Sequence, residues 1–362
     1  MKYKQLRLGD LAEFTTGKLN ANKAVEDGKY PFFTTSPETL RINNFAFDQD
    51  AILLGGNNAN GVFQLKRYTG KFNAYQRTYV ISVVKENIIN NDYLYYALMP
   101  KLVELQNKSL GTATKFITKR ILENLLIKVP NNYNEMERRA TYLRTIDNKI
   151  QLNKQLNANL FELTKNYWEL FKSNYKTKYL SISELANKVV TGKTPSKKKK
   201  EYYENGNVPF IKIPDMHGRV FVTDSTEHLS TVGANSQKSK FIPKGSIIVS
   251  CIGTPGLVAM TSKRCQTNQQ INSIIIDSKI VYAVFLELQN LRKYIINLGS
   301  GGTTISNLNK SDFQNIKLSV PSIDKMCMFD VEVQPIFQQI LSNELENKNL
   351  DRIKNELLMK LF

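Results

Sequence analysis

Short apolar runs alternate with polar stretches along most of this chain, and several runs end at a glycine or a proline. Runs of this length that are rich in isoleucine, leucine and valine are typical of buried β-strands. Glycine and proline mark the turns that follow such strands. The pattern predicts strands at residues 51–55, 79–84, 126–130, 246–249, 274–276 and 317–321.

Two stretches follow a helical period instead. The first covers about residues 134–172, and the second fills the C-terminal end of the chain. In each, residues spaced three and four apart form one stripe, and Thr164 and Lys354 each fill one gap in it. The stripe residues are Ile146, Ile150, Asn153, Asn157, Leu160, Tyr167 and Phe171 in the first stretch, and Ile336, Ile340, Asn343, Asn347, Leu350, Leu357 and Leu361 in the second.

The two stripes predict long helices that pair as an antiparallel coiled coil. They match without a gap, because Ile150 corresponds to Ile340 and Phe171 to Leu361. An inserted residue would rotate the face of a helix by about 100°. The asparagines in the stripes either fix the register of the seam or lie at its solvated edge. Pro335 suits a first helical turn and favours a helix that begins there, with a kink as the alternative.

The second half of the chain repeats the order of the first. Leu11-Ala12 leads to Gly17-Lys18 in one half, and Leu185-Ala186 leads to Thr191-Gly192-Lys193 in the other. Each half then has a glycine-bounded strand, a β-rich run, a helical segment of roughly 20 residues and a strand that ends in proline. The distance between matching residues drifts, which indicates that loops diverged on a shared scaffold.

This repeat predicts an α+β fold with two pseudo-repeated mixed α/β domains, each followed by a long helix. The expected boundaries are residues 1–132 for the first domain, 133–177 for the first helical spacer, 178–322 for the second domain and 323–362 for the second helical spacer.

Positive charge changes the picture further. The chain has 50 Lys and Arg against 32 Asp and Glu, a formal net charge of +18. Such an excess favours a polyanionic partner, because lysine and arginine release condensed counterions when they bind phosphates. The alternative is a lysine-rich proteome encoded by an AT-rich genome, with which the many Asn, Lys and Ile residues are consistent.

Several other classes are excluded or disfavoured. No apolar run is long enough to span a membrane and the N-terminus does not read as a signal peptide, so we expect a cytoplasmic protein. The three cysteines and two histidines lack metal-ligand spacing, so we expect no metal and no disulfide framework. We also find no glycine-rich dinucleotide fingerprint or methyltransferase motif, and we expect neither a cofactor nor a catalytic residue.

The order of these pieces resembles the specificity (S) subunit of type I restriction–modification systems. The likeness covers nearly the whole chain and rests on the repeated openings, Asn268-Gln269-Gln270 and Leu143-x-x-Ile146-Asp147-x-x-Ile150-x-x-Asn153. No single motif is specific to this family, but the repeated order of the motifs is. The sequence departs from the family where the helices begin, at Glu135-Met136 and Lys325-Met326, and Phe337 stands where Asp147 would be repeated.

The resemblance implies a non-catalytic subunit in which each domain is a target-recognition domain for one half of a split, asymmetric double-stranded DNA site. It also implies two kinds of partner, methyltransferase (M) subunits that use S-adenosylmethionine and a restriction/translocase (R) subunit. The paired helices would act as spacer and docking element. The coiled-coil and partner residues are then Ile146, Ile150, Asn153, Leu160, Phe171, Ile336, Ile340, Asn343, Leu350 and Leu361.

Candidate phosphate contacts cluster in turns and in one lysine run. The segment at Gly192-Lys193-Thr194 ends like a phosphate loop, but Asn187 stands where the signature requires glycine and Pro195 follows. We therefore interpret it as a turn that presents lysine to DNA; for the lysine run a merely solvated role is the alternative. The candidates are Lys18, Lys115, Lys193, Thr194, Lys197, Lys198, Lys199, Lys200 and Thr303.

Candidate base contacts come from side chains with paired donors and acceptors. Tyr75-Gln76-Arg77 and Asn268-Gln269-Gln270 hold matched positions, with a structural role in a shared turn as the alternative. That alternative is favoured for Gln76 and Gln269, whereas base readers should differ between halves, as Arg77 and Gln270 do. The candidates are Tyr75, Arg77, Asn268 and Gln270, together with Asn57 and Asn58 in a glycine-rich loop that could instead be a plain hairpin turn.

Two other functions remain open from the sequence. A duplicated adaptor could use its helices to assemble proteins, with the charge incidental. A metal-dependent enzyme that acts on nucleic acid would need clustered acids, and Asp48 and Asp50 are the nearest, with no counterpart in the second half.

Overall fold

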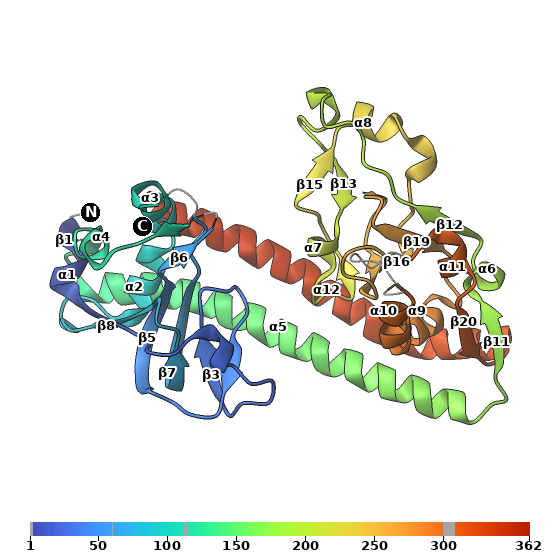
Figure 1. The fold of residues 1–362 in the computed structure, drawn as a ribbon, viewed down its shortest axis with the longest axis horizontal. Coiled ribbons are helices and arrows are strands. Elements are labelled where there is room, and N and C mark those ends of the chain that lie inside the picture. The colour runs from blue at the N-terminus through green and yellow to red at the C-terminus, as the bar shows by residue number, and fades with distance from the viewer. Residues whose placement is uncertain (1–2, 60, 112–113, 300–307) are drawn as a thin grey trace. The chain divides into compact units, whose positions relative to one another are not determined.

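The computed structural model describes residues 3–59, 61–111, 114–299 and 308–362 (Figure 1). The chain forms two compact units. Unit 1 consists of Met1–Lys149 with Leu350–Phe362, and unit 2 of Ile150–Asn349. Each unit therefore contains one mixed α/β domain and a part of both long helices.

Unit 1 is built on a six-stranded sheet with strand order β2-β8-β5-β7-β3-β4. The strands are β2 (Ala12–Thr16), β3 (Tyr30–Phe33), β4 (Leu40–Ile42), β5 (Phe47–Gly55), β7 (Leu65–Ala74) and β8 (Thr78–Val83). Two further antiparallel pairs lie beside it, β1 (Tyr3–Arg7) with β10 (Leu126–Pro130) and β6 (Asn57–Asn58) with β9 (Lys115–Phe116).

Helices cover the core of unit 1. They are α1 (Leu8–Leu11), α2 (Asn91–Leu98), α3 (Lys101–Lys108) and α4 (Lys119–Glu123). The segment expected as one helix of about 20 residues is thus two helices, which Pro100 separates. Buried Ile52 and Leu54 of β5 pack in one cluster with Tyr93 and Leu94 of α2. The apolar run of β5 is therefore the centre of this core.

Unit 2 repeats this plan with two sheets, of order β12-β19-β16-β17-β14 and β15-β13-β18. Its strands are β11 (Lys178–Ser181), β12 (Lys188–Thr191), β13 (Val208–Ile211), β14 (Phe221–Val222), β15 (Glu227–Leu229), β16 (Ile247–Ser250), β17 (Val258–Thr261), β18 (Gln266–Thr267), β19 (Ile271–Ile275) and β20 (Lys317–Val320). Its helices are α6 (Ile182–Leu185), α7 (Ile213–Met216), α8 (Thr231–Asn235), α9 (Val281–Asn290), α10 (Arg292–Gly299) and α11 (Lys310–Gln314).

The pairing of strands confirms the internal repeat. In unit 1, β8 pairs antiparallel with both β2 and β5; in unit 2, β19 pairs antiparallel with both β12 and β16. The closing strand of each domain returns to its opening strand, β10 to β1 and β20 to β11. Strands lie at all six predicted runs, although β5 begins four residues and β19 three residues earlier than expected.

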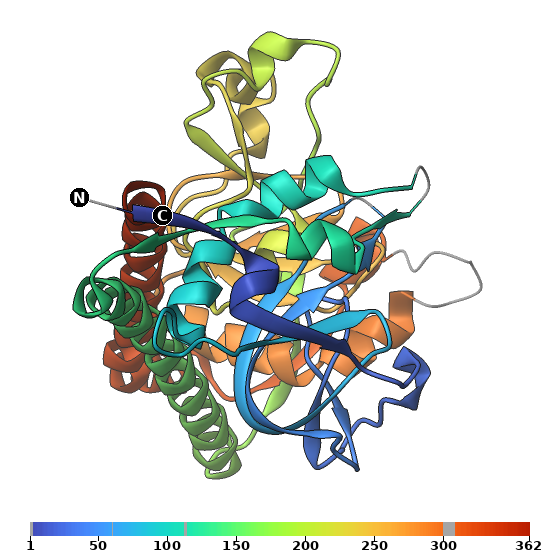
Figure 2. The ribbon, with the colours of Figure 1, turned by 90° about the vertical axis from the view of Figure 1, so that its left-hand side faces the viewer.

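Two long helices follow the domains, α5 (Tyr133–Ser173) and α12 (Ile323–Leu361) (Figure 2). The first begins and ends within one residue of its prediction. The second does not begin at Pro335, which lies inside α12, so that expectation was wrong. A proline lacks only one backbone donor, and the flanking turns are held by buried Val333 and Phe337.

The two helices pair antiparallel through the predicted stripes. In unit 1 the start of α5 meets the end of α12, where Lys354 donates to Asp147 over 2.6 Å. In unit 2 the rest of α5 lies against the rest of α12. Every stripe residue is buried or half-buried, as a seam requires.

The asparagines lie inside this seam, which decides between the two alternatives. Asn343 donates to the Oδ1 atom of Asn157 over 2.7 Å, and both residues are buried. Asn153, also buried, donates to the Oδ1 atom of Asn347 over 2.9 Å. Paired amides satisfy each other only in one alignment, so they fix the register of the two helices.

Removing Asn343 should destabilise unit 2 by about 1–3 kcal/mol, because the Oδ1 atom of buried Asn157 loses its donor. Asn343→Ala tests this, and replacing both asparagines by leucine should restore most of the loss, since no unpaired amide remains. Trp168, the only tryptophan and fully buried in unit 2, reports unfolding in urea by its fluorescence. Equal losses in the single and the double variant would contradict the expected coupling.

Two carboxylates of α12 fasten the domain of unit 2 to the helix. Asp330 is buried and accepts from the backbone N–H groups of Tyr282 and Ala283, both at 2.8 Å, at the start of α9. Glu344 accepts from those of Val220 and Phe221 at 3.1 and 3.0 Å. Loss of water raises the pKa of each carboxyl to about 7, against the lowering effect of these N–H groups.

The stability of unit 2 should therefore decrease as the pH rises from about 4 to about 8. Folding raises the pKa of both carboxyls above their unfolded values of 3.8 and 4.5, so the folded state binds protons more tightly. This contribution is complete below the unfolded pKa values and is lost as the pH passes about 7, at roughly 1.4 kcal/mol per unit of pKa difference. The free energy of unfolding, measured in urea by Trp168 fluorescence, should depend less steeply on pH in the Glu344→Gln variant than in the wild type. The exposed control Asp324→Asn should behave as the wild type, and an unchanged slope in Glu344→Gln would refute the assignment.

No helix within the described ranges is long and apolar enough to cross a membrane.

Candidate nucleic-acid interface

In unit 1, the turn after β2 packs against the turn between β7 and β8. Gly17 has no room for a side chain, because a Cβ atom would lie 1.7 Å from the carbonyl oxygen of Ala74. Gln76 donates its side-chain amide to Asn20 over 2.7 Å and so braces the same contact. Lys18 lies exposed at this junction, and the glycine is the reason that the turn can present it there.

The glycine-rich loop after β5 joins this junction from the other side. Gly56 donates its backbone N–H to the carbonyl oxygen of Arg77 over 2.7 Å. The next residues form β6, in which Asn58 pairs with Lys115 of β9. Arg77, Lys115 and the two asparagines, predicted separately along the sequence, are thereby brought together. The buried Oδ1 atom of Asn57 has no hydrogen-bond donor within the described residues.

Unit 2 builds the same junction from its own residues. A Cβ atom on Gly192 would lie 2.1 Å from the carbonyl oxygen of Asn268. Thr194 donates its hydroxyl to the side chain of Gln269 over 2.5 Å, the counterpart of the brace in unit 1. Cys251 donates its backbone N–H to the carbonyl oxygen of Gln270 over 2.8 Å, as Gly56 does to Arg77. Lys193 is exposed beside it.

The two junctions differ in the side chain that each leaves available. Gln270 accepts a hydrogen bond from Asn268 over 2.9 Å, and buried Asn268 in turn accepts the backbone N–H of Gln270 over 3.2 Å. Both side chains are thus used within the turn. Arg77, by contrast, is exposed and has no side-chain hydrogen bond or ion pair among the residues that the structure describes. Arg77 is the stronger candidate for base contact.

The lysine run lies on an exposed loop of unit 2 that leads into a short 3-10 helix, Lys200–Tyr202. Lys199 lies over the ring of Tyr202, 5.1 Å from its centroid. Lys197, Lys198 and Lys200 form no ion pair within the described ranges, so their charge is available to an anion. Of the two remaining candidates, Tyr75 is half-buried in the turn between β7 and β8, and Thr303 lies outside the described residues.

The features considered for metal chemistry have other roles. Cys251 and Cys265 are buried, and burial raises the pKa of the first thiol to about 11 and of the second to about 12. Asp50 accepts from Arg67 and Thr69. Among the described residues, no cluster of three or more His, Cys, Asp or Glu side chains could hold a metal ion.

A second surface was missed from the sequence. Leu152, Leu156, Leu163 and Leu170 of α5 are 59%, 40%, 58% and 64% exposed. Their spacing of four, seven and seven residues puts them on one line along the helix, beside the seam and outside it. The signal was present as a second apolar period, which the stronger seam pattern concealed. We call these four residues the leucine stripe.

Comparison with known proteins agrees with this architecture. The family described as type I restriction modification DNA specificity domain matches residues 1–162 and 174–355. The chain belongs to this family, and the resemblance found in the sequence is confirmed.

Two relatives match part of the chain. It is 49% identical over 186 residues to the type I restriction enzyme HindI specificity subunit of Haemophilus influenzae, and this alignment covers 50% of this chain and 40% of that one. It is 41% identical over 129 residues to the EcoDI specificity subunit of Escherichia coli, which covers 36% and 28%. The alignments thus span less than half the length of these relatives.

A solved structure shares the whole fold. The S subunit of a type I restriction-modification system from M. genitalium matches with a TM-score of 0.64 at 18% identity, over 100% of this chain and 96% of that one. The predicted fold class is confirmed: two repeated mixed α/β domains, each followed by a long helix, with the helices paired antiparallel.

Proposed function

We propose that this chain selects the DNA sequence for a type I restriction–modification complex, with each domain binding one element of a split, asymmetric double-stranded site. The observation that carries the proposal is the pair of matched junctions, around Gly17 and Gly192. They share a backbone arrangement and differ in the side chains that they leave free. A shared backbone arrangement that presents different base-contacting side chains is what we expect of a protein that recognises two different DNA elements.

Charge supports the same proposal. The formal net charge of +18 gives sequence-independent attraction to DNA, and Lys18, Lys115 and Lys193 at the junctions would contact phosphates. The lysine run adds further contacts in unit 2. These residues would position the domains, while Arg77 reads a base in the first element.

Catalysis would belong to the partners. In this proposal M subunits methylate adenine within the selected site, an R subunit translocates and cuts unmodified DNA, and this chain supplies no catalytic residue or cofactor. All three act on cellular DNA, which implies a cytoplasmic location. The domains would be residues 1–132 and 178–322, joined by the spacers at 133–177 and 323–362.

The leucine stripe is the surface that we assign to an M subunit. The predicted seam residues of α5 and α12 face each other within the chain, so they are not available to another protein. The stripe leaves four large apolar side chains exposed along roughly 27 Å of α5, at 1.5 Å of rise per residue. A helix of the partner with an apolar face would cover such a line.

The paired helices would also set the separation of the two DNA elements. α5 has 41 residues. At 1.5 Å per residue it is roughly 60 Å long, which corresponds to one to two turns of DNA between the elements.

The test is a map of methylated bases in a host that expresses this gene and its partners, with the gene intact and deleted. The proposal requires that deletion removes adenine methylation at one split, asymmetric motif, and that the gene supplied on a plasmid restores it. An unchanged map would reject the role in DNA recognition and favour the protein-assembly adaptor.

A further inference from the structure

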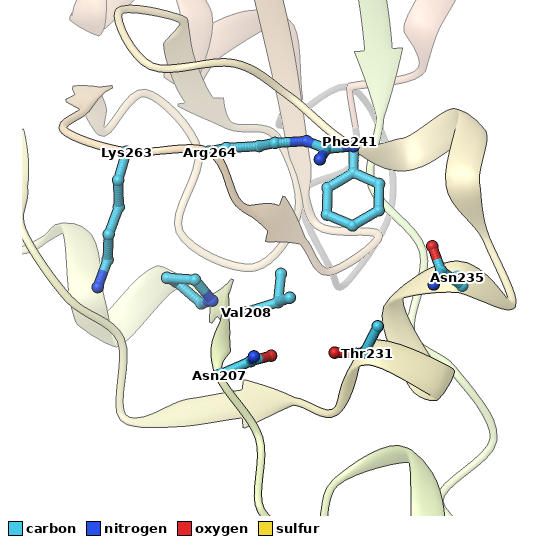
Figure 3. A pocket seen from close by; sticks show the side chains of 8 residues that line it. Asn207, Val208, Thr231, Asn235, Phe241, Lys263 and Arg264 are labelled. Carbon is cyan, nitrogen blue, oxygen red and sulfur yellow. The ribbon is translucent and has the colours of Figure 1, made fainter.

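Unit 2 contains a cavity of about 370 Å³ at the edge of its three-stranded sheet (Figure 3). Its apolar floor comes from Val208 at the start of β13 and from Phe241, whose ring points into the cavity. Thr231 and Asn235 on α8 form one wall, and Lys263, in the turn before β18, lies on the opposite side, while Arg264 from the same turn extends to the ring of Phe241. The cavity therefore combines an aromatic surface, amides and cations.

Three of the polar side chains that line this cavity are not used to hold the fold together. Within the described ranges, the side chains of Asn207, Thr231 and Asn235 take part in no hydrogen bond. Neighbouring side chains in the same lobe do bond within the fold: Gln237 donates to the carbonyl oxygen of Lys193, and Ser230 donates to that of Glu201. These polar groups surround an apolar floor and form no hydrogen bond within the fold, so they are available to a ligand.

Arg264 is held in place without a counter-ion. Its guanidinium carbon lies 3.8 Å from the centroid of the Phe241 ring, which fixes the plane of the group by stacking. No carboxylate among the described residues pairs with it, whereas its neighbour Lys263 pairs with Asp224 over 3.3 Å. A guanidinium held in this way keeps its N–H edge for a phosphate or another anion.

The cavity belongs to the part of the repeat that diverged most. The chain between Gly192 and Ser246, which carries α8 and Phe241, is longer than the matching chain between Gly17 and Ala51 of unit 1. Figure 1 shows α8, β13 and β15 together at one end of unit 2. Residues that only the longer copy contains are not needed to build the shared scaffold.

We propose that this cavity binds one nucleotide unit, a nucleobase together with its phosphate. The base would lie against Val208 and Phe241, the amides of Asn207 and Asn235 would bond its polar edge, and Arg264 would hold the phosphate. Each contact follows known preferences, since bases bury their faces on apolar and aromatic groups and amides match the paired donors and acceptors of bases.

Two sources would supply this chemistry. One is a nucleotide of the bound duplex that has left the base stack; this source rests on the proposed function. The other is a free mononucleotide, which requires no DNA binding. The cavity is the same in both cases, and the experiment separates them.

The experiment uses the full chain, with its M subunit for the duplex arm. Duplexes that carry the mapped site receive 5-iodouracil at single positions and are irradiated, and the crosslinked peptide is identified by mass spectrometry. In the second arm, the four nucleoside monophosphates and ribose 5-phosphate are titrated calorimetrically against the chain. Asn235→Ala and Arg264→Gln should each lower crosslink yield or affinity about tenfold, as expected for one hydrogen bond to a charged or polar ligand group. Lys310→Gln, an exposed cation of α11, is the matched control and should change neither.

A crosslink at Phe241 without mononucleotide binding assigns the cavity to duplex DNA. Binding of a monophosphate, but not of ribose 5-phosphate, assigns it to a free nucleotide. If the wild-type complex binds and methylates its site but neither arm gives a signal, the inference is wrong and the proposed function stands. If the wild-type complex binds no site, the proposed function fails and the titration alone decides the cavity. Unchanged unfolding by Trp168 fluorescence shows that each variant is folded.

Discussion

Replacing Leu156 and Leu163 together by glutamate is expected to abolish methylation at the site that this chain selects, while the chain stays folded. Both side chains are exposed in the free chain, 40% and 58%, so the unfolding free energy should change by no more than about 1 kcal/mol. In the complex the same positions would face an apolar helix of the M subunit. Two carboxylates buried there without partners would weaken assembly roughly 100-fold or more.

Copurification of the M subunit and the methylation map of the host provide the measurement. The matched control is Gln151→Glu with Gln155→Glu, which adds the same charge to the same helix but on the face away from both the seam and the leucine stripe. A double leucine variant that still assembles and methylates would remove the leucine stripe from the docking surface. It would leave the recognition role of the domains unaffected.

Replacing Arg77 should change which sequence is methylated, and in one element only. Arg77→Ala would lose a paired contact to a base, expected to cost about 1–3 kcal/mol, which is roughly 5–150-fold in affinity for the correct site. Arg77→Lys keeps the charge but not the two-pronged geometry. It should therefore keep nonspecific, salt-dependent affinity while accepting more than one base at a single position.

Methylation maps of hosts that carry each variant would show this as one degenerate position in one half of the motif. Lys85→Ala removes an exposed cation just beyond the far end of β8 from Arg77 and should leave the motif unchanged. If both Arg77 variants methylate the original motif with full selectivity, Arg77 contacts the backbone or nothing. The reader of the first element would then lie elsewhere in unit 1.

The sequence by itself determined the repeat, the strands and the helical seam. These follow from local periodicity: the apolar run of β5 must be buried, and a three- and four-residue spacing puts Ile150 and Phe171 on one face of a helix. The matched glycines were also visible, although only the structure shows that Gly17 and Gly192 each lie against a carbonyl oxygen of the next turn.

Only the tertiary structure decided which polar side chains are free to act. Arg77 and Gln270 hold equivalent places in the sequence, yet the side chain of Gln270 is bonded to Asn268, whereas that of Arg77 has no hydrogen bond or ion pair among the described residues. Asn157 could have been a solvated residue until Asn343, far away in the sequence, was found to donate to it. The course of α12 through Pro335 and the cavity beside Phe241 likewise depend on distant neighbours. Burial can be predicted from short stretches of sequence because it repeats with the period of the helix or strand. A hydrogen bond between distant residues has no such period, and it forms only when folding brings the donor and the acceptor together.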